Sequence, residues 1–437
     1  MQKFKEVLLA SKTVSVWGIG YLGYSTILLL QSQGFFVNVY SWDNVTAADI
    51  KKGAYPTGKQ RNLWSVKDEV PAVDISRLSI KSSPDDLFPS AVHIIALPYI
   101  KTDGGEDVLS AIADTFIKNG KRAANSLVIF QAAGVPGGIE GEFIGRIENA
   151  KIKCFYASAF RSDWTFEEFF SNEKAVVLSG YSQESLDKVQ VFYDALGIKN
   201  SSLATLKEAE IYENTKNSIE YVFSAILNQL SLAYPETDIT KMVKLLSSLF
   251  GLNEAAISVG TSSYRTLNSI NHLLMGANNP GMLSIIKESQ AVNLSSLLNY
   301  ADAVKRRGAR SVTILGLSVK GDLKDIRLSP SLILAEYFNE NGITVFVNDP
   351  FFTEKEIKEI LPFANFIDIK NGKLITDAVF IMASHKEYRY FTQKDIERLC
   401  INNRKIIIDN TGLLKAFRFS SKATYHVPGD GKLQQLG

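Results

Sequence analysis

The feature that most constrains the fold is a glycine-rich turn near the start of the chain, in "TVSVWGIGYLGYSTILLLQSQG". A buried-strand pattern precedes the turn, and apolar residues recur at helical spacing after it. The glycines have the spacing G-x-G-x-x-G. In such a junction the first permits a tight turn, the second lets a pyrophosphate approach the backbone at a helix N-terminus, and the third lets helix and strand pack closely. We therefore predict a dinucleotide site, rather than a purely structural turn, formed by Gly18, Ile19, Gly20, Tyr21, Leu22 and Gly23.

A second cofactor contact is expected where the next strand, "FFVNVYSWD", ends. In dinucleotide-binding folds an acidic residue there binds the adenosine ribose. Ser41 stands at that position. Asp43 follows two residues later, either as the ribose ligand or as the cap of the next helix. A serine in place of the acid weakens the case for NAD over NADP, whereas no arginine follows that would hold a 2′-phosphate. NAD is named as the cofactor, and NADP stays open. Pro98, which ends "AVHIIALP", completes the predicted cofactor site.

The order of strand and helix patterns divides the 437 residues into three parts. Strands alternate with helices up to about residue 200, which predicts a parallel, doubly wound sheet. The next hundred residues show helical patterns, beginning with the long run "LKEAEIYENTKNSIEYVFSAILNQLSLAYPE", and alternation returns at "SVTILGLSVK". We predict an α/β fold in which two Rossmann-like domains, 1–200 and 305–437, flank a helical dimerisation domain, 201–304, with a long central helix.

The composition argues against several classes of protein. A formal net charge of +2, without any basic tract, does not suggest a nucleic-acid or membrane surface. No apolar run approaches the length of a bilayer span, and the N-terminus is interpreted as a helix and strand rather than a signal peptide. Two cysteines and four scattered histidines indicate neither a disulfide framework nor a metal site. The expectation is a cytoplasmic multidomain protein.

Several stretches along the chain resemble the UDP-glucose/GDP-mannose dehydrogenase family. They are "VWGIGYLG", "KKGAYP", "GVPGG", "AEIYENTKNSIEYVFSAILNQL", "LGLSVKGDLKDIRLSPS", "VFVNDP" and "AVFIMASHKEY". The fifth is the most specific, because five positions match together: Lys320, Asp325, Arg327, Ser329 and Pro330. The resemblance spans nearly the whole chain and implies two Rossmann-like domains around a helical dimerisation domain. It also implies that two NAD oxidise the C6 hydroxyl of a nucleotide sugar to a carboxylate, through a cysteine thiohemiacetal.

The reactive cysteine of that family is missing. The resemblance places it in "GANNPGML", residues 276–283, where Met282 or Leu283 stands nearest. Cys154 lies in the strand pattern "KIKCFYAS" and is interpreted as a small packing residue rather than a replacement nucleophile. Cys400, in "IERLCINN", is interpreted as a packing residue of a C-terminal helix.

Other reactive positions of the family differ as well. Its central-helix lysine is replaced by Glu213, whereas the following asparagine is kept as Asn217. Its Ser-Thr pair becomes Gln131 and Ala132, and Phe160 stands where an acid is expected. We expect that these positions no longer carry out the reaction of the family.

Three further side chains were candidates for a relocated function. Lys216 lies three residues after Glu213, and pairing with that carboxylate or with solvent is favoured over a catalytic role. His272 and His385 are isolated in the sequence, and a lone histidine is typical of packing or of a polar surface. In the family, the residue that His385 matches has no role in hydride transfer.

A second set of family positions is retained. Arg265, Lys320, Asp325 and Arg327 match positions that contact the sugar or the nucleotide, and cationic side chains suit phosphate recognition. The alternative for Asp325 and Arg327 is that they hold the turn before a helix that Ser329 caps.

Three hypotheses of function follow. The first is a diverged oxidoreductase that binds NAD(P) and a UDP- or GDP-sugar in a cleft between the end domains and makes one alcohol–carbonyl conversion with Glu213 as base. It would act as a homodimer through the central helix, in polysaccharide or nucleotide-sugar metabolism. The second is a non-catalytic partner or regulatory homologue of such an enzyme. The third, an unmodified sugar-acid-forming dehydrogenase, requires Cys154 to reach the hydride site.

Overall fold

The computed structural model describes most of the chain and divides into two compact units. The described residues are 4, 6, 10–42, 50, 72–97, 108–161, 176–250, 264–322, 324–369, 376–397, 399, 405–417, 419 and 423–436. Unit 1 consists of Met1–Thr57, Val66–Thr215 and His272–Pro280, and unit 2 of Gly58–Ser65, Lys216–Asn271 and Gly281–Gly437.

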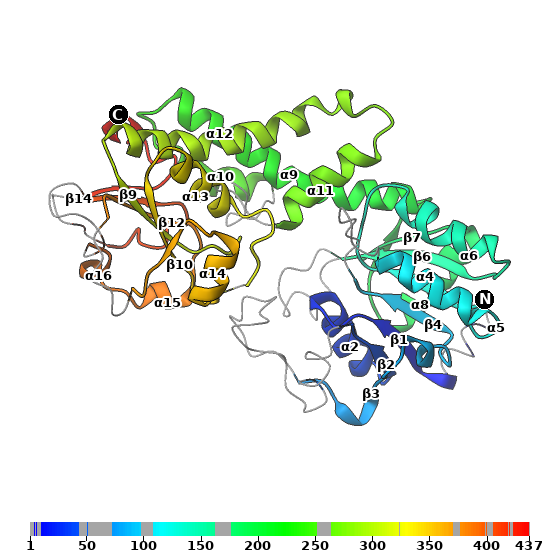
Figure 1. Cartoon of the computed structure of the whole chain (residues 1–437). Coiled ribbons are helices and arrows are strands. Elements are labelled where there is room, and N and C mark those ends of the chain that lie inside the picture. The colour runs from blue at the N-terminus through cyan, green and yellow to red at the C-terminus, as the bar shows by residue number, and fades with distance from the viewer. Residues whose placement is uncertain are drawn as a thin grey trace. The chain divides into compact units, whose positions relative to one another are not determined.

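Unit 1 contains a sheet in the order β3-β2-β1-β4-β5-β6-β7-β8 (Figure 1). Its strands are β1 (Thr13–Trp17), β2 (Phe36–Tyr40), β3 (Leu78–Ile80), β4 (Val92–Ile95), β5 (Leu127–Phe130), β6 (Phe155–Phe160), β7 (Val176–Gly180) and β8 (Asn200–Ser202). Neighbouring strands are parallel except β6 and β7. The order reverses between β1 and β4, where doubly wound sheets bind ligands beyond the carboxyl ends of the strands.

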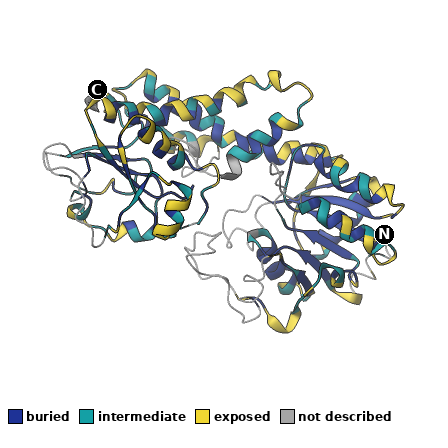
Figure 2. Cartoon of the chain, in the orientation of Figure 1, coloured by how far each residue is buried: buried dark blue, intermediate teal, exposed yellow. Residues whose placement is uncertain are grey.

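Helices complete unit 1. They are α2 (Tyr21–Ser32), α4 (Val108–Lys118), α5 (Gly120–Ala123), α6 (Gly145–Asn149) and α8 (Gln183–Ala195), with the 3-10 helices η1 (Ile75–Arg77) and η2 (Pro84–Leu87) and the π-helix η3 (Ile139–Ile144). An aromatic cluster fills part of the core: the Trp17 ring stacks on Phe116 at a centroid distance of 5.5 Å, and Phe143 meets Phe130 edge-on at 5.1 Å. Figure 2 shows the central strands of the unit 1 sheet as buried, and nearly every residue of β1, β4, β5 and β6 is buried.

The described part of 206–306 is helical, apart from an isolated bridge between Asp238 and Asp430. Its helices are α9 (Leu206–Ala233), α10 (Thr240–Phe250), α11 (Tyr264–Gly276) and α12 (Ser284–Arg306), with the short turn η5 (Pro280–Met282). The long central helix is confirmed as α9. It contributes residues up to Thr215 to unit 1 and the remainder to unit 2, so the three predicted domain boundaries stay a prediction.

Unit 2 contains a second parallel sheet, in the order β11-β10-β9-β12-β13-β14. Its strands are β9 (Ser311–Leu315), β10 (Thr344–Asn348), β11 (Asn365–Phe366), β12 (Ala378–Ile381), β13 (Lys405–Asp409) and β14 (Ala423–His426). Its helices are α13 (Pro330–Glu340), α14 (Glu354–Ile360), α15 (Lys386–Arg389) and α16 (Gln393–Glu397), followed by η6 (Leu433–Leu436). The α13 N-cap is confirmed, because the Ser329 hydroxyl accepts from Ser331 N at 3.2 Å and Pro330 lies in the first turn.

The α/β class, the two parallel-sheet domains and the helical central region are thus as predicted. Both sheets reverse order next to their first strand, and each places a loop directly after that strand. Among the helices that the structure describes, none is long and apolar enough to cross a membrane.

Candidate functional site

The glycine turn of unit 1 has the geometry that a dinucleotide requires. Gly18 has φ +95°, and a Cβ there would lie 2.5 Å from Leu97 Cδ2. A Cβ on Gly23 would lie 2.0 Å from the carbonyl oxygen of Gly18, so this glycine allows α2 to pack against the turn. A Cβ on Gly20 would meet no atom of the described residues within 4 Å. The second glycine therefore faces open space, as an approaching pyrophosphate needs.

The N-terminus of α2 begins at the same open glycine. Gly20 is the N-cap, no side chain caps the helix, and no acidic residue lies in its first turn. The first N–H groups of a helix lack intrahelical acceptors and carry partial positive charge. These residues fit the phosphates of a nicotinamide dinucleotide.

The ribose end of the predicted cofactor site is only partly described. Ser41 follows β2 and is buried, and the exposed Trp42 packs edge-on against Tyr40 at a centroid distance of 4.9 Å. Asp43 and Pro98 lie outside the described residues. The roles of Ser41 and Asp43 therefore stay predictions.

The first half of α9 carries a buried polar face. Glu210, Glu213, Asn214 and Asn217 are all buried, and their spacing of three, four and seven residues places them on one side of the helix. Buried polar groups need hydrogen-bond partners. The predicted catalytic residues Glu213 and Asn217 thus belong to a larger polar set.

Glu210 and Asn214 attach the loop after β5 to α9. The Glu210 carboxylate accepts from Gly137 N at 2.7 Å and from Ile139 N at 3.4 Å, and Asn214 Nδ2 donates to Gly134 O at 2.8 Å. Burial raises the pKa of Glu210 to about 8, although the two N–H groups oppose the shift. Sequence reasoning missed both side chains, although their place in the central-helix motif was a usable signal.

His272 of α11 joins the same network. Asn214 Nδ2 also donates to Glu210 O at 2.8 Å, so its Oδ1 is the acceptor for His272 Nδ1 at 3.3 Å. Burial lowers the pKa of His272 to about 4. At the end of α11 a Cβ on Gly276 would lie 2.6 Å from Pro136 Cδ, so the stretch 276–283 starts against the "GVPGG" loop. His272 is therefore a packed, hydrogen-bonded residue, one of the two roles considered for it.

Two of the positions that the sequence resemblance predicts to differ from the family support packing. Gln131 Oε1 accepts from the Thr26 hydroxyl at 2.9 Å and so links β5 to α2. Phe160 is buried at the end of β6, and Met282, in the stretch expected to hold the cysteine, is 78% exposed. None of these side chains is a nucleophile, an acid or a base.

Cys154 lies at the edge of the sheet opposite to the glycine turn. It immediately precedes β6, whereas Gly18 follows β1, and β1, β4, β5 and β6 are parallel. A six-residue strand spans roughly 20 Å. The thiol is buried, donates to Ala123 O at 3.2 Å, and has its pKa raised to about 11 by burial. Cys154 is a packing residue, as predicted, and Cys400 lies outside the described residues.

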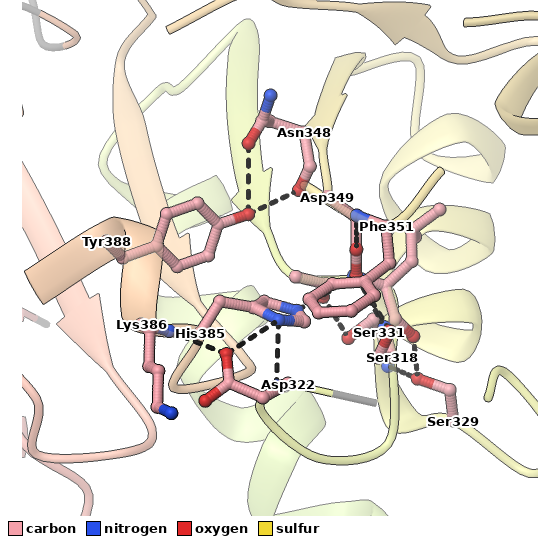
Figure 3. A network of polar contacts seen from close by, with 12 residues as sticks. Ser318, Asp322, Ser329, Ser331, Asn348, Asp349, Phe351, His385, Lys386 and Tyr388 are labelled. Atoms are coloured by element: carbon pink, nitrogen blue, oxygen red, sulfur yellow. Dashed lines mark hydrogen bonds and ion pairs between the residues drawn. The ribbon is translucent and has the colours of Figure 1, made fainter. Parts of the chain in front are cut away.

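In unit 2 the backbone N–H groups of the turn after β9, the counterpart of the glycine turn, are hydrogen-bonded to the side chain of Asp349. Asp349, directly after β10, accepts from Leu317 N, Ser318 N, Ser318 Oγ and His385 Nε2 on Oδ2, and from Phe351 N on Oδ1, at 2.8 to 3.1 Å (Figure 3). Burial alone would raise the pKa of Asp349, but the bonds from His385, Phe351 and Ser318 lower it below its usual value.

His385 extends that network to a third segment. It is fully buried, its Nδ1 accepts from Asp322 N at 3.0 Å, and Phe351 stacks on its ring at 5.2 Å. The loop after β9 is also crowded, because a Cβ on Gly316 would lie 2.5 Å from Ala383 Cβ. His385 is therefore a structural residue of the fold.

The retained family residues of unit 2 border this turn. Arg327 makes a bidentate pair with Asp325, through Nε to Oδ1 at 2.9 Å and a terminal nitrogen to Oδ2 at 2.6 Å. The Asp325 carboxylate also accepts from Arg327 N at 3.0 Å, which is consistent with the alternative that the two residues hold the turn, and both interpretations stay predictions. Lys320 is exposed. Arg265 belongs to α11, but its side chain lies outside the described part of the structure.

A cavity of about 490 Å³ lies beyond the carboxyl ends of β12 and β13 in unit 2. Its lining is Ser384, Arg389, Thr411, Gly412, Leu413, Leu414 and Phe417. The buried Asp409 carboxylate organises one wall, since it accepts from Thr411 N at 3.1 Å and Leu414 N at 2.8 Å. Within the described part of the chain, the exposed Arg389 guanidinium has no ion-pair or hydrogen-bond partner. The size and the free cation suit a small anionic ligand.

Metal ions in proteins are held by sets of His, Cys, Asp and Glu side chains. No group of three or more His, Cys, Asp or Glu that could hold a metal ion occurs among the residues that the structure describes.

The open second glycine generates a specific prediction. Gly20→Ala should fold normally, because φ −79° and ψ −165° suit any residue, yet weaken NAD binding by at least about tenfold, since its methyl occupies the space for the pyrophosphate. Gly23→Ala should instead lower the free energy of unfolding by about 1–3 kcal/mol through overpacking. Titration calorimetry and denaturant unfolding measure both. Unchanged NAD affinity in Gly20→Ala would show that the turn binds no dinucleotide.

Known proteins are similar to this chain in sequence. Residues 313–416 match the family model described as "UDP-glucose/GDP-mannose dehydrogenase family, UDP binding domain". A UDP-N-acetyl-D-mannosamine dehydrogenase of Methanocaldococcus jannaschii is 22% identical over 96% of this chain and 97% of its own length, and Protein CapL of Staphylococcus aureus is 21% identical over 93% and 97%.

Solved structures agree in fold. A UDP-glucose dehydrogenase from Pyrobaculum islandicum aligns with TM-score 0.75 at 17% identity, covering 96% of this chain and 97% of its own. A UDP-D-ManNAc dehydrogenase from Pyrococcus horikoshii aligns with TM-score 0.73 at 18% identity, covering 96% and 99%. The resemblance predicted from the sequence motifs is confirmed: residues 313–416 match the UDP-binding-domain model of the UDP-glucose/GDP-mannose dehydrogenase family, and relatives named as nucleotide-sugar dehydrogenases are similar over nearly the whole chain.

Proposed function

We propose that this protein is a nucleotide-sugar oxidoreductase that binds NAD at the glycine turn of unit 1 and a UDP-sugar through unit 2. The observation that carries the proposal is the open space at Gly20, at the uncapped N-terminus of α2. Similarity to proteins named UDP-sugar dehydrogenases supports the substrate class. No arginine stands in the residues directly after β2, 41–60, to hold a 2′-phosphate, so NAD is proposed, and NADP stays open because Ser41 replaces the usual acid.

The nucleotide part of the substrate is assigned to the cavity between the ends of β12 and β13. Arg389 would bind a phosphate, because its guanidinium lines that cavity without a partner among the described residues. The retained Lys320 and Arg265, with the Asp325–Arg327 pair at the turn, remain proposed substrate residues. Asp325 and Arg327 would act by holding the turn, since their side chains bind each other.

The reaction that these residues support is a single two-electron conversion of a sugar alcohol to a carbonyl. Glu213 would accept the hydroxyl proton and Asn217 would position the sugar, both from the buried face of α9. Bound NAD would supply the hydride acceptor. A second oxidation to the acid by the family's route needs a thiol. Of the two cysteines in the chain, Cys154 is buried at the opposite edge of the sheet, and Cys400 is predicted to pack on a helix.

The second candidate function is a non-catalytic, ligand-binding partner of a related dehydrogenase. One observation favours it: Gln131 and Phe160 stand at reactive positions of the family and serve packing instead. The two candidates predict the same ligands and differ in turnover. The cytoplasmic location stays a prediction.

The binding half of the proposal is tested by thermal stability with NAD, NADP and UDP-, GDP- and dTDP-sugars. A ligand at about a hundred times its Kd adds roughly 2.7 kcal/mol to stability. We expect stabilisation by NAD and by a UDP-sugar. Arg389→Met should lose most of the UDP-sugar effect and keep that of NAD, whereas Lys355→Met, at an exposed lysine of α14, should keep both. A chain that neither ligand stabilises would contradict both candidate functions.

The catalytic half is tested with Glu213→Gln. If Glu213 is the base, this variant should lose turnover by at least about a hundredfold, since general-base catalysis contributes roughly 10²–10⁴-fold. Its NAD and UDP-sugar affinities should stay within about threefold of the original, because the amide keeps the size and polarity of the side chain. The exposed Glu208→Gln on the same helix is the control. Undiminished turnover would remove Glu213 from the mechanism.

We further propose a homodimer through the central helices. Unit 2 exposes a group of large apolar side chains on α9 and α10: Ile219, Ile226, Leu245, Leu249 and Phe250. Phe250 contacts Phe223 at a centroid distance of 5.9 Å, so α10 packs beside α9 and their apolar residues form one surface. Apolar patches of this kind mark interfaces.

Leu245→Glu tests the dimer. The leucine is 73% exposed, so the fold should tolerate glutamate, whereas an interface would bury its charge. Light scattering during size-exclusion chromatography should give twice the chain mass for the unchanged protein and the single mass for the variant. Ile75→Glu, at an exposed isoleucine of unit 1, should leave the mass unchanged. A monomeric unchanged protein would contradict the proposal.

A further inference from the structure

A second cavity, of about 500 Å³, lies at the edge of the unit 1 sheet opposite to the glycine turn. Its lining includes the residues just before β4 and β5 and the first residue of β6: Ser90, Ala91, Asn125, Ser126 and Phe155. These are the amino ends of parallel strands, whereas Gly18–Gly23 follows a carboxyl end. The cavity therefore has no part in the dinucleotide site.

A lysine is buried in one wall of this cavity. Lys188 of α8 has only 11% of its side chain exposed, and its ammonium lies 4.3 Å from the Phe155 ring centroid and 4.8 Å from that of Phe4. Its acidic partner, Glu184, is 3.5 Å away and more than half exposed. An ammonium loses hydration on burial, and two rings and one exposed carboxylate compensate for this only in part. The cavity beside the ammonium has room for a further anionic partner.

The rest of the lining combines polar groups with aromatic rings. Arg122 is exposed and contributes a second cation, with one terminal nitrogen bound to Asn119 Oδ1 at 3.0 Å. The buried Ser126 and the exposed Asn125 make no side-chain hydrogen bond within the described part of the chain. Phe88 adds a further ring. Among the described residues that line the cavity, two are cationic and none carries a carboxylate.

We propose that this cavity binds a small planar ring that carries a carboxylate or a phosphate. The anionic group would meet Lys188 and Arg122 and accept from Ser126 or Asn125, while the ring packs against Phe88 and Phe155. A volume of this size accommodates such a molecule. The site is independent of the proposed oxidoreductase function, since it lies at the other edge of the sheet.

The test is titration calorimetry of the full chain with phenyl phosphate and with benzoate. We expect one site per chain for at least one of them, and the better ligand identifies the anionic group. Inorganic phosphate and benzyl alcohol, which each lack one half of the ligand, should bind at least about tenfold more weakly. Saturating NAD and UDP should not displace the ring anion. Displacement by either would place the binding at the cofactor or nucleotide site and overturn the proposal.

Two variants locate the site. Lys188→Met should weaken binding by at least about tenfold, whereas Lys199→Met, at an exposed lysine of the same unit, should not change it. If Lys188→Met fails to fold, Arg122→Met, at an exposed position on the rim of the cavity, replaces it and should also weaken binding of the ring anion. Equal binding by inorganic phosphate, unchanged binding in both pocket variants, or no binding of either ring anion would each refute the proposal. Failure of NAD to bind would contradict the proposed oxidoreductase function but not this proposal, because the cavity lies at the other edge of the sheet.

Discussion

The five hydrogen bonds that converge on the Asp349 carboxylate determine how unit 2 is built and what it is free to bind. They connect the end of β10 to the loop after β9 and, through His385, to the segment after β12. Leu317 N and Ser318 N, which lie where a dinucleotide fold presents its turn to phosphate, are already satisfied by this carboxylate. Unit 1 has the opposite arrangement, since Gly20 faces open space and α2 starts without a cap.

The two units therefore differ in the ligand that each one suits, although their strand orders match around the first strand. The open turn of unit 1 suits a pyrophosphate. In unit 2 Arg389, which has no partner among the described residues, lies further along the sheet, beyond β12 and β13. The buried polar face of α9 has its own loop contacts, through Glu210 and Asn214. The two turns differ in whether their backbone N–H groups are already hydrogen-bonded to a carboxylate of the protein: those of Leu317 and Ser318 are, whereas no side chain caps the start of α2 in the described part of the chain.

Much of the fold could be predicted from the sequence, because local patterns determine it. The glycine spacing, the strand–helix alternation and the α13 cap are local, and the structure confirms them. The site was harder, because its polar contacts join distant segments: Glu210 binds a loop about seventy residues earlier in the chain, and His272 reaches Asn214 from another helix. No local pattern shows that the Asp349 carboxylate accepts hydrogen bonds from neighbouring loops of unit 2. Nor does one show that Arg389 has no partner among the described residues. That the reactive side chains of the family are absent stays a prediction from the sequence resemblance, and the packing of Gln131 and Cys154 is consistent with it.

The central claim, which remains a proposal, is that this protein oxidises a nucleotide sugar by one two-electron step, without a thiol. The most direct measurement is the number of NADH formed per nucleotide sugar consumed, with the product identified by mass spectrometry. The account predicts one NADH per sugar and a product two mass units lighter that carries a carbonyl group. Two NADH per sugar and a carboxylate product would contradict it, because they would require a thiol or an equivalent nucleophile that we have not assigned.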